Sequence, residues 1–515
     1  MDRTVILFPS SALSEVSPIL IDSTKLAVPL NAAALHQLPA QVARPRYDRS
    51  RVHARIVHIG AGGFNRSHLA TYLDDLLSTA EGDWGEFGVG LMPGDEQIHR
   101  DLAQQDYLYG VLELDSDRQS YRVIGSLVEH VYAPESPAAV LDRIAAAECA
   151  IVSMTVTEGG YFIEDATGNF LASHPDVQHD LQHSTSPRTW VGYVTEAARR
   201  RMLSGGAPFT LLSCDNLQSN GSTARKAVLA FAEARDKHLQ QWIEDNVSFP
   251  NSMVDRITPR TTVEHRERIA LAFNVVDRSP IVCESFRQWV VEDKFIAGSP
   301  AWANVGVQFT ADIAPYEETK MRLLNGGHSC IGYPADLLGH TYIADAVNDP
   351  LLRNLLIQFM AEACHTLKPL PGVDLDTYSE TIVRRFANPA IRDQISRICS
   401  NGSAKIAKFI LPTIRDLVRL GPRPRIVPVV LAAWLHYVSL RDASGQIEDP
   451  AIEKLRAFIS AGGSDARLAL QNRIVFGDLA ESSPSLVADV QAHLNTMRKN
   501  GVHAGISQAV GKIPA

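Results

Sequence analysis

Short apolar runs that alternate with helical patterns constrain the fold of this chain more than any other feature. Apolar residues recur with helical spacing at 67–77, 137–148 and 223–245. The runs typical of strands are RIVHIGAGGF (55–64), FGVGLM (87–92), YRVIGSLVEHVY (121–132), AIVSMTVTEGGYF (150–162) and FTLLSCDN (209–216). Most of them are almost continuously apolar, as strands buried on both faces are. The alternation predicts a parallel, doubly wound sheet.

From about residue 310 onward, helical patterns dominate and strand-like runs are few. We therefore predict an α/β protein, with a Rossmann-type doubly wound domain at 51–305 followed by a mainly α-helical domain at 306–515. A cleft between the two domains would be the natural place for an active site. Residues 1–50 carry five prolines and little periodic pattern. We expect them to form an arm on the surface or to be partly disordered.

Composition narrows the class of protein. The chain has 515 residues, of which 45 % are apolar and 21 % charged, as is typical of a soluble globular protein. The net charge of −9 argues against a general role on nucleic acid or anionic lipid. Six cysteines are scattered singly, which suits neither a zinc site nor a disulfide framework, and apolar runs stay far below the roughly 18 residues that span a bilayer. We expect a cytoplasmic monomer that binds neither nucleic acid nor membrane.

A glycine-rich segment joins the first predicted strand to the helix that follows it. This is the context in which a dinucleotide pyrophosphate binds, because small residues let the backbone approach and the helix start offers free N–H groups. The strict G-x-G-x-x-G pattern fails at its sixth position, which is Asn65. A tight turn without a ligand is the alternative. The predicted cofactor loop consists of Gly60, Ala61, Gly62, Gly63 and Phe64.

Asp95 is the candidate for the acid that binds the ribose hydroxyls of a dinucleotide. It follows the second predicted strand, although its offset from Gly60 is longer than the usual distance of about 20 residues. Residues 88–99 contain no Arg or Lys to receive a 2′-phosphate, which favours NAD over NADP. Asp95 could equally cap the helix after it, and the two roles are compatible.

Polar residues at three further places are candidates for the chemistry. Asn216 ends an apolar strand, where ligands of doubly wound folds bind, so it could donate to a substrate oxygen or simply form a turn. Lys320, Asn325 and His328 fall at roughly 0°, 140° and 80° on a continuous helix at about 100° per residue. They would share one arc, with Gly326 and Gly327 weakening the helix. The alternative is a solvated lysine and a core histidine.

Two cations and one acid remain to be explained. Arg397 and Lys405 lie beside a Ser-Asn-Gly turn, where fixed donors would suit the hydroxyls of a small polar substrate or merely be surface charge. Asp255 lies in VDRITP (254–259), an unusual place for an acid because apolar residues surround it and a Thr-Pro pair follows.

Together these segments resemble the polyol-specific long-chain dehydrogenases, and among them the mannitol-oxidising members. The resemblance runs from about residue 55 to the end of the chain, and long runs such as SCDNLQSNG and MVDRITPR make it specific. It implies metal-free, NAD-dependent oxidation of a polyol secondary alcohol to a ketose, with D-mannitol and D-fructose as the expected pair. Other polyols remain open alternatives: arabinitol, sorbitol, a hexuronate or a phosphorylated polyol. A non-catalytic NAD-binding sensor is a further alternative.

The resemblance also implies roles for single residues. By the motif E-x-K-x-R-L-L-N-G-x-H, Lys320 is the expected general base. Asn216 and Asn325 match the asparagines that bind the developing alkoxide, and His328 matches the histidine that orients the substrate. The family usually has G-F-H-R where this chain has Asn65, and an acid is common where this chain has Gly94.

The remaining matches are charged residues around the expected base. Glu158 matches an active-site glutamate, and Glu317 a glutamate tied to proton passage. Arg397 and Lys405 match substrate-contacting positions. Asp255 is expected near the lysine, but a carboxylate that touched the amine would raise its pKa and oppose its use as a base. We therefore expect Asp255 to act as a structural or water-mediated partner.

Overall fold

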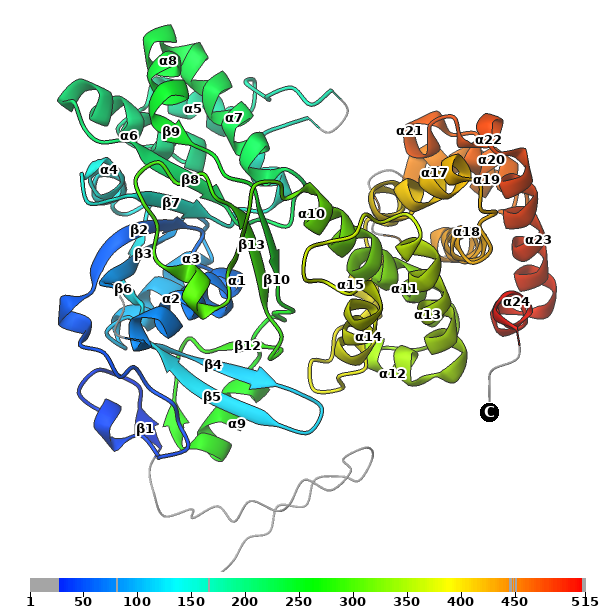
Figure 1. Cartoon of the computed structure of the whole chain (residues 1–515), viewed down its shortest axis with the longest axis horizontal. Helices are drawn as coiled ribbons and strands as arrows, with labels where there is room; N and C mark the ends of the chain where they lie inside the picture. The colour runs from blue at the N-terminus through cyan, green and yellow to red at the C-terminus, as the bar shows by residue number, and fades with distance from the viewer. Residues whose placement is uncertain are drawn as a thin grey trace, which may run out of the picture.

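The structure is a computed structural model and describes residues 27–79, 82–164, 167–443, 447, 449 and 452–511. Figure 1 shows an α/β part and a helical part that lie side by side, with helix α10 (Ala314–Lys320) between them. The Rossmann-type sheet followed by a helical domain confirms the predicted fold class. Residues 1–26 of the expected arm lie outside the described residues. Its remainder packs on the α/β part through β1 (Val28–Pro29), which pairs with β11 (Val275–Val276).

The central sheet has six parallel strands in the order β6-β3-β2-β7-β8-β9. Numbered from its first strand this is the order 3-2-1-4-5-6 of a Rossmann sheet, so the carboxyl ends of β2 and β7 meet where the connections reverse. Ile56 of β2 is buried against helix α2, whereas Val57 and Ile59 are buried in the cluster with α4, α6 and α7. Successive side chains face opposite helical layers, which explains the continuous apolar runs.

The strands of the central sheet are β2 (His53–Ile59), β3 (Trp84–Gly90), β6 (Leu127–Tyr132), β7 (Ile151–Met154), β8 (Phe209–Ser213) and β9 (Val247–Ser248). Two smaller sheets adjoin it, with the strand orders β10-β13-β14 and β12-β4-β5. Their strands are β4 (Tyr109–Leu114), β5 (Gln119–Ile124), β10 (Ser252–Asp255), β12 (Ile281–Cys283), β13 (Gln288–Glu292) and β14 (Gln308–Thr310). The helices of the α/β part are α1 (Gly63–Ser67), α2 (Leu69–Ser78), α3 (Asp95–Ala103), α4 (Pro137–Ala145), α5 (Pro175–Gln182), α6 (Trp190–Ser204), α7 (Asn220–Arg235), α8 (Lys237–Asn246) and α9 (Val263–Phe273).

Two segments that read as single elements are divided. The predicted strand 121–132 is two strands in different sheets, β5 and β6, separated at Gly125. A Cβ atom at Gly125 would lie 2.8 Å from Pro45, so the chain turns where the N-terminal segment passes closest. The predicted helix 223–245 is α7 and α8, divided at Asp236, whose extended backbone and carboxylate bond to the His238 amide start a new helix.

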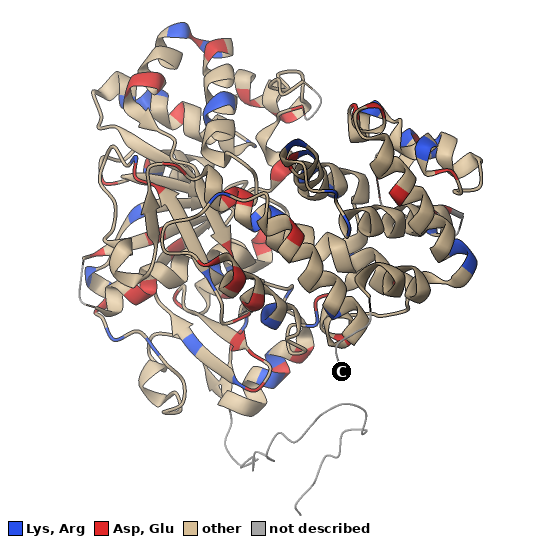
Figure 2. Ribbon diagram, turned by 45° about the vertical axis from the view of Figure 1, so that its right-hand side comes forward, with Lys and Arg blue, Asp and Glu red and all other residues tan. Residues whose placement is uncertain are grey.

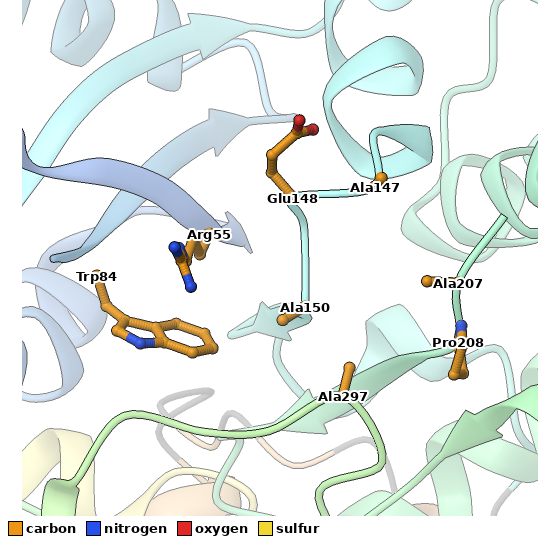
Figure 3. A pocket seen from close by; sticks show the side chains of 8 residues that line it. All are labelled: Arg55, Trp84, Ala147, Glu148, Ala150, Ala207, Pro208 and Ala297. Atoms are coloured by element: carbon orange, nitrogen blue, oxygen red, sulfur yellow. The ribbon is translucent and has the colours of Figure 1, made fainter. Parts of the chain in front are cut away.

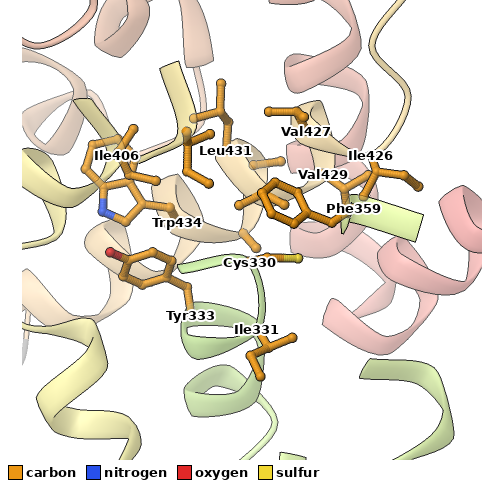
Figure 4. Packing of buried hydrophobic residues seen from close by; sticks show 14 of the residues in the cluster. Cys330, Ile331, Tyr333, Phe359, Ile406, Ile426, Val427, Val429, Leu431 and Trp434 are labelled. Carbon is orange, nitrogen blue, oxygen red and sulfur yellow. The ribbon is translucent and has the colours of Figure 1, made fainter. Parts of the chain in front are cut away.

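The helical part has one large core. The cluster in Figure 4 brings together side chains from α11, α13 and α18, including Tyr333, Phe359 and Trp434. The helices are α11 (Gly326–Leu337), α12 (Ile343–Asn348), α13 (Pro350–Cys364), α14 (Leu375–Phe386), α15 (Ile395–Cys399), α16 (Gly402–Lys405), α17 (Leu411–Leu420), α18 (Val427–Ala443), α19 (Arg456–Ser460), α20 (Ala466–Leu470), α21 (Arg473–Phe476), α22 (Leu479–Ser482), α23 (Pro484–Asn500) and α24 (Val502–Val510).

Two turns in the helical part are wider than an α-helix. The π-helical turn η5 (Met321–Asn325) joins α10 to α11, and the π-helical turn η6 (Ile406–Ile410) joins α16 to α17. Each begins directly after a lysine, Lys320 or Lys405, and the two turns contact each other. Such turns are rare and are frequently found at functional sites.

Basic and acidic residues are interspersed in both parts (Figure 2). Over the part of the chain that the structure describes, helices long and apolar enough to cross a membrane are absent.

Candidate active site

The glycine loop lies at the carboxyl end of β2, as predicted. Gly60 has φ +85°, and a Cβ atom there would lie 2.2 Å from the carbonyl oxygen of Thr155, so only glycine fits. The amides of Gly60 and Ala61 both donate to the carbonyl of Val89, at 2.8 and 3.3 Å, which fixes the loop against the end of β3. Gly62 then precedes α1. The closely packed backbone suits the approach of a pyrophosphate group.

Asn65 and Asp95 flank this loop. Asn65 is fully buried and donates to Glu86 at 3.1 Å, so the residue that departs from the family pattern points into the protein. Asp95 is the first residue of α3, and its carboxylate accepts the Met92 amide at 2.8 Å rather than capping the helix end. A Cβ atom at Gly90, the last residue of β3, would lie 2.6 Å from Cβ of Asp95. Asp95 therefore lies at the carboxyl end of β3, beside the glycine loop.

Lys320 reaches from the end of α10 to the α/β part. It is 7 % exposed, and its Nζ donates to Oδ1 of Asn216 at 2.6 Å and to the carbonyl of Val254 at 2.8 Å. Burial lowers its pKa, because an ammonium group loses its hydration there. Asn216 is exposed at the carboxyl end of β8. Since its amide oxygen is bound by the lysine, its NH₂ group is left to donate to a ligand.

Glu317 lies one helical turn before Lys320 on α10. Both of its carboxylate oxygens accept the Ser219 amide, at 3.0 and 3.2 Å. Burial raises its pKa to about 7, with the Ser219 hydrogen bond acting in the opposite direction. It lines the same small pocket as Lys320 and Asn216. A carboxyl group that titrates near neutrality beside a buried amine can pass protons.

Asn325 and His328 follow the lysine, but not on the regular helix assumed from sequence. The turn η5 lies between Lys320 and Asn325, so the spacing of about 100° per residue does not hold across it. His328 stacks on Phe386 with ring centroids 3.9 Å apart, and its Nε2 lies 3.9 Å from Asp393. Burial lowers the pKa of His328 to about 3, which leaves the ring neutral. Nε2 is a buried atom without a hydrogen-bond partner in the structure.

The two predicted substrate-binding cations lie on either side of a turn. Arg397 is 62 % exposed and pairs with Asp393 at 2.6 Å, the same acid that approaches His328. Lys405 donates to the carbonyls of Arg397 and Ile398 at 3.1 and 2.8 Å, so it caps the carboxyl end of α15. The carboxylate of Asp393 thus links one predicted cation to the predicted histidine.

Glu158 forms an ion pair that links the α/β part to the helical part. It begins the 3-10 turn η3 (Glu158–Tyr161) after β7, and its carboxylate pairs with Lys408 of the helical part at 2.8 Å. Asp215 holds the turn by accepting the amides of Val156 and Thr157 at 3.1 and 2.8 Å. Thr157 has φ +65°, so the segment before Glu158 is held in a conformation that few residues adopt.

Asp255 does not bond to Lys320 but forms a buried ion pair with Arg385, a residue that is not among the sequence-based predictions. The guanidinium of Arg385 on α14 makes two hydrogen bonds to the Asp255 carboxylate, at 2.8 and 2.9 Å. Burial would raise the pKa of Asp255, but Arg385 outweighs it and holds the pKa below its usual range. Both side chains are 4 % exposed.

A second pocket lies at the opposite edge of the central sheet. Figure 3 shows it between Arg55, Trp84, Glu148 and five small residues, four alanines and Pro208. Trp84 begins β3, and Ala150 and Pro208 each directly precede a strand, so this is the amino edge of the sheet. Ligands of doubly wound folds bind at the carboxyl edge instead. The candidate active site is therefore the one at the carboxyl edge, which contains Lys320 and the glycine loop.

A Rossmann sheet with a glycine loop at its switch point, and a buried lysine beside an exposed asparagine at the same edge, define a dehydrogenase. Two family models match the chain, described as the mannitol dehydrogenase Rossmann domain at residues 54–304 and the mannitol dehydrogenase C-terminal domain at residues 312–498. The chain belongs to the mannitol dehydrogenase family.

Individual relatives match over nearly their whole length. Mannitol 2-dehydrogenase of Neosartorya fischeri is 40 % identical over 92 % of this chain and 97 % of its own. The solved structure of Pseudomonas fluorescens mannitol 2-dehydrogenase, a ternary complex with NAD and D-mannitol, is 42 % identical, covers 93 % of this chain and 99 % of its own, and has a TM-score of 0.82. A D-sorbitol dehydrogenase structure in substrate-free form is 36 % identical, covers 93 % of this chain and 100 % of its own, and has a TM-score of 0.86.

Proposed function

We propose that this protein catalyses the NAD-dependent oxidation of a polyol secondary alcohol to a ketose, D-mannitol to D-fructose, and the reverse reduction. The observation that carries the proposal is the Nζ of Lys320, which is hydrogen-bonded to Asn216 and belongs to a buried side chain that lines a small pocket. Oxidation of an alcohol needs a base for the hydroxyl proton and donors for the alkoxide that forms. The match to a complex of a relative with NAD and D-mannitol supports the same reaction.

In this mechanism Lys320 accepts the hydroxyl proton in its neutral form. The NH₂ groups of Asn216 and Asn325 donate to the developing alkoxide, and neutral His328 orients the substrate. Glu317 passes the proton on from the lysine, and Glu158, Arg397 and Lys405 contact the substrate hydroxyls. NAD, when bound, supplies the hydride acceptor. The loop of Gly60, Ala61, Gly62, Gly63 and Phe64 would hold its pyrophosphate, and Asp95 its adenosine ribose.

Substrate choice is tested by initial rates. We expect the highest kcat/KM among polyols for D-mannitol and among ketoses for D-fructose. D-sorbitol is the second candidate, because a D-sorbitol dehydrogenase shares the fold over 93 % of this chain. Arabinitol and a phosphorylated polyol complete the panel. A preference for D-sorbitol would leave the reaction class intact and change the assigned substrate, whereas inactivity on every polyol would support the NAD-binding sensor.

Replacing Asp95 by alanine should weaken the preference for NAD over NADP. The carboxylate lies at the end of β3, where it would bind ribose hydroxyls and repel a 2′-phosphate. We expect the ratio of the two kcat/KM values to fall by about tenfold or more, the equivalent of one hydrogen bond to a charged group. Asp101→Ala, farther along the same helix, is the matched control. A ratio that stays at the parent value would exclude Asp95 from the cofactor site.

The reaction should need no metal ion. The six cysteines are free, and the described residues hold no group of three or more His, Cys, Asp or Glu side chains placed to bind a metal. We expect full activity after exhaustive treatment with EDTA, measured at saturating NAD and polyol. Activity that is lost and then returns with added zinc would point to a metal-assisted reaction.

We also propose that the protein is a monomer of the cytoplasm. The scattered cysteines, each free in the structure, suit a reducing compartment. Sedimentation velocity at micromolar concentration should give a single species near 56.4 kDa.

A further inference from the structure

The buried ion pair of Asp255 extends to a second acid. Arg385 donates from Nε and Nη2 to the carboxylate of Glu284, at 3.0 and 2.7 Å, while its other contacts bind Asp255. The three side chains are 3 to 4 % exposed, and the guanidinium lies 3.9 Å from the ring centroid of Phe286. Arg385 belongs to α14 of the helical part, whereas both acids belong to the α/β part. One cation therefore joins the two parts beside the site.

This ion pair adjoins the predicted base through the backbone. Asp255 directly follows Val254, whose carbonyl accepts the Lys320 ammonium at 2.8 Å. The carboxylate of Asp255 is directed to Arg385 and not to the lysine. The fork of the guanidinium binds both carboxylate oxygens, whereas the amine of Lys320 donates to Asn216 and to the Val254 carbonyl.

Burial has the largest effect on the pKa of Lys320 and lowers it, and nearby charged groups add smaller effects. Asp255 and Glu317 favour its ammonium form, and Arg385 and Lys408 disfavour it. Arg385 itself faces Asp255 and Glu284. Burial has the largest effect on the pKa values of Tyr378 and His328, and the charge of Arg385 acts to lower both. A guanidinium stays charged at every pH at which an enzyme works. The positive charge of Arg385 is therefore permanent, and it offsets the charge of Asp255 whether the lysine is protonated or not.

We propose that Arg385 is a positioning residue of the reaction, which binds Asp255 and offsets part of its negative charge so that the amine of Lys320 can act as a base. The inference rests on the proposed function, because it concerns the same proton transfer. After Arg385, Lys320 is the cation that most favours the ionised form of the buried Asp255 carboxylate, so its influence would dominate without Arg385. The ammonium form would then be stabilised, and fewer molecules would carry the neutral amine at neutral pH.

The test is the pH dependence of kcat/KM for D-mannitol oxidation at saturating NAD. In Arg385→Met the apparent pKa of the base should rise by about one pH unit or more, with the lost rate partly regained at alkaline pH. In Asp255→Asn, which leaves the guanidinium in place, the apparent pKa of the base should fall. Arg385→Lys keeps the charge but loses the fork, so its rate should drop while the apparent pKa stays near the parent value. Arg384→Met removes the exposed neighbour of Arg385 and should change neither quantity.

Opposite shifts of the apparent pKa in Arg385→Met and Asp255→Asn would distinguish this role from a purely structural one. If Arg385 only held the two parts together, Arg385→Met and Asp255→Asn would lower the rate by the same factor at every pH and leave the apparent pKa unchanged, which would overturn the proposal.

NADH binding, followed by quenching of protein fluorescence, reports whether each variant is folded. If Arg385→Met does not fold, Glu284→Gln decides, because it frees positive charge near the lysine and should lower the apparent pKa. A Lys320→Ala variant that stays active would refute the proposed function, whereas an inactive Lys320→Ala with unshifted profiles would refute this inference alone.

Discussion

Lys320→Ala should lower kcat for D-mannitol oxidation by several orders of magnitude while NADH still binds. Lys320 is 7 % exposed, and its amine is hydrogen-bonded to Asn216 and to the Val254 carbonyl, so solvent cannot easily replace it as the base. Burial lowers the pKa of Lys320. Oxidation needs the neutral amine, so its rate should rise with pH through that pKa. Reduction needs the ammonium form, so its rate should fall.

The pH profile supplies the control for this variant. The limb assigned to the base should vanish in Lys320→Ala, and an added small amine should restore part of the rate. Lys499→Ala, which removes an exposed lysine near the end of α23, should leave both the rate and the profile unchanged. Retention of most of the activity at every pH in Lys320→Ala would contradict the mechanism.

Asn216→Ala should lower kcat for polyol oxidation on the order of 100-fold, the usual cost of one donor to a developing oxyanion. The side chain lies at the carboxyl end of β8, and its amide oxygen accepts from Lys320 at 2.6 Å. The substitution therefore removes a donor to the alkoxide and also a contact that aims the lysine. Single-turnover rates at saturating substrate would measure the effect on the chemical step.

A second substitution at the same position separates these two contributions. Asn216→Asp keeps the acceptor for the lysine but replaces the donor by a carboxylate. The pKa of the base should therefore rise, and the rate should fall. Asn495→Ala, on the exposed face of α23, is the matched control. If Asn216→Ala kept more than half of the parent rate, another group would have to stabilise the alkoxide.

Local sequence predicted the sheet well because its signal is short-range. Each strand of the central sheet apart from β9 overlaps a mostly apolar segment that predicts a strand, and the glycine loop needs a backbone that only glycine can adopt at position 60. The division of 121–132 at Gly125 depends instead on the nearby Pro45, which lies far away along the chain. Patterns within one segment cannot report such an approach.

The site was less predictable from the residues alone. Most of the role assignments came from the resemblance to a family. The spacing of the residues alone was also compatible with Lys320 as a solvated lysine and His328 as a core histidine. Arg385 shows the limit most clearly. It is adjacent to Arg384 in the same helix, yet one is exposed and the other is buried between acids that lie 130 and 101 residues away along the chain. Two identical neighbouring residues differ only in what the rest of the fold brings to them.

The π-helical turn after Lys320 sets which changes of length this stretch can accept. A π-helical turn holds one more residue than an α-helical turn, so deleting a single residue within Met321–Asn325 would let the segment close into a continuous α-helix with little rotation of α11 about its axis. His328 would then keep its stacking position on Phe386. A residue added or removed within the regular helix α11 before His328 would instead rotate everything beyond it by about 100°. Among homologous chains, the loss of one residue within the π-helical turn should therefore be the commonest change of length between Lys320 and His328.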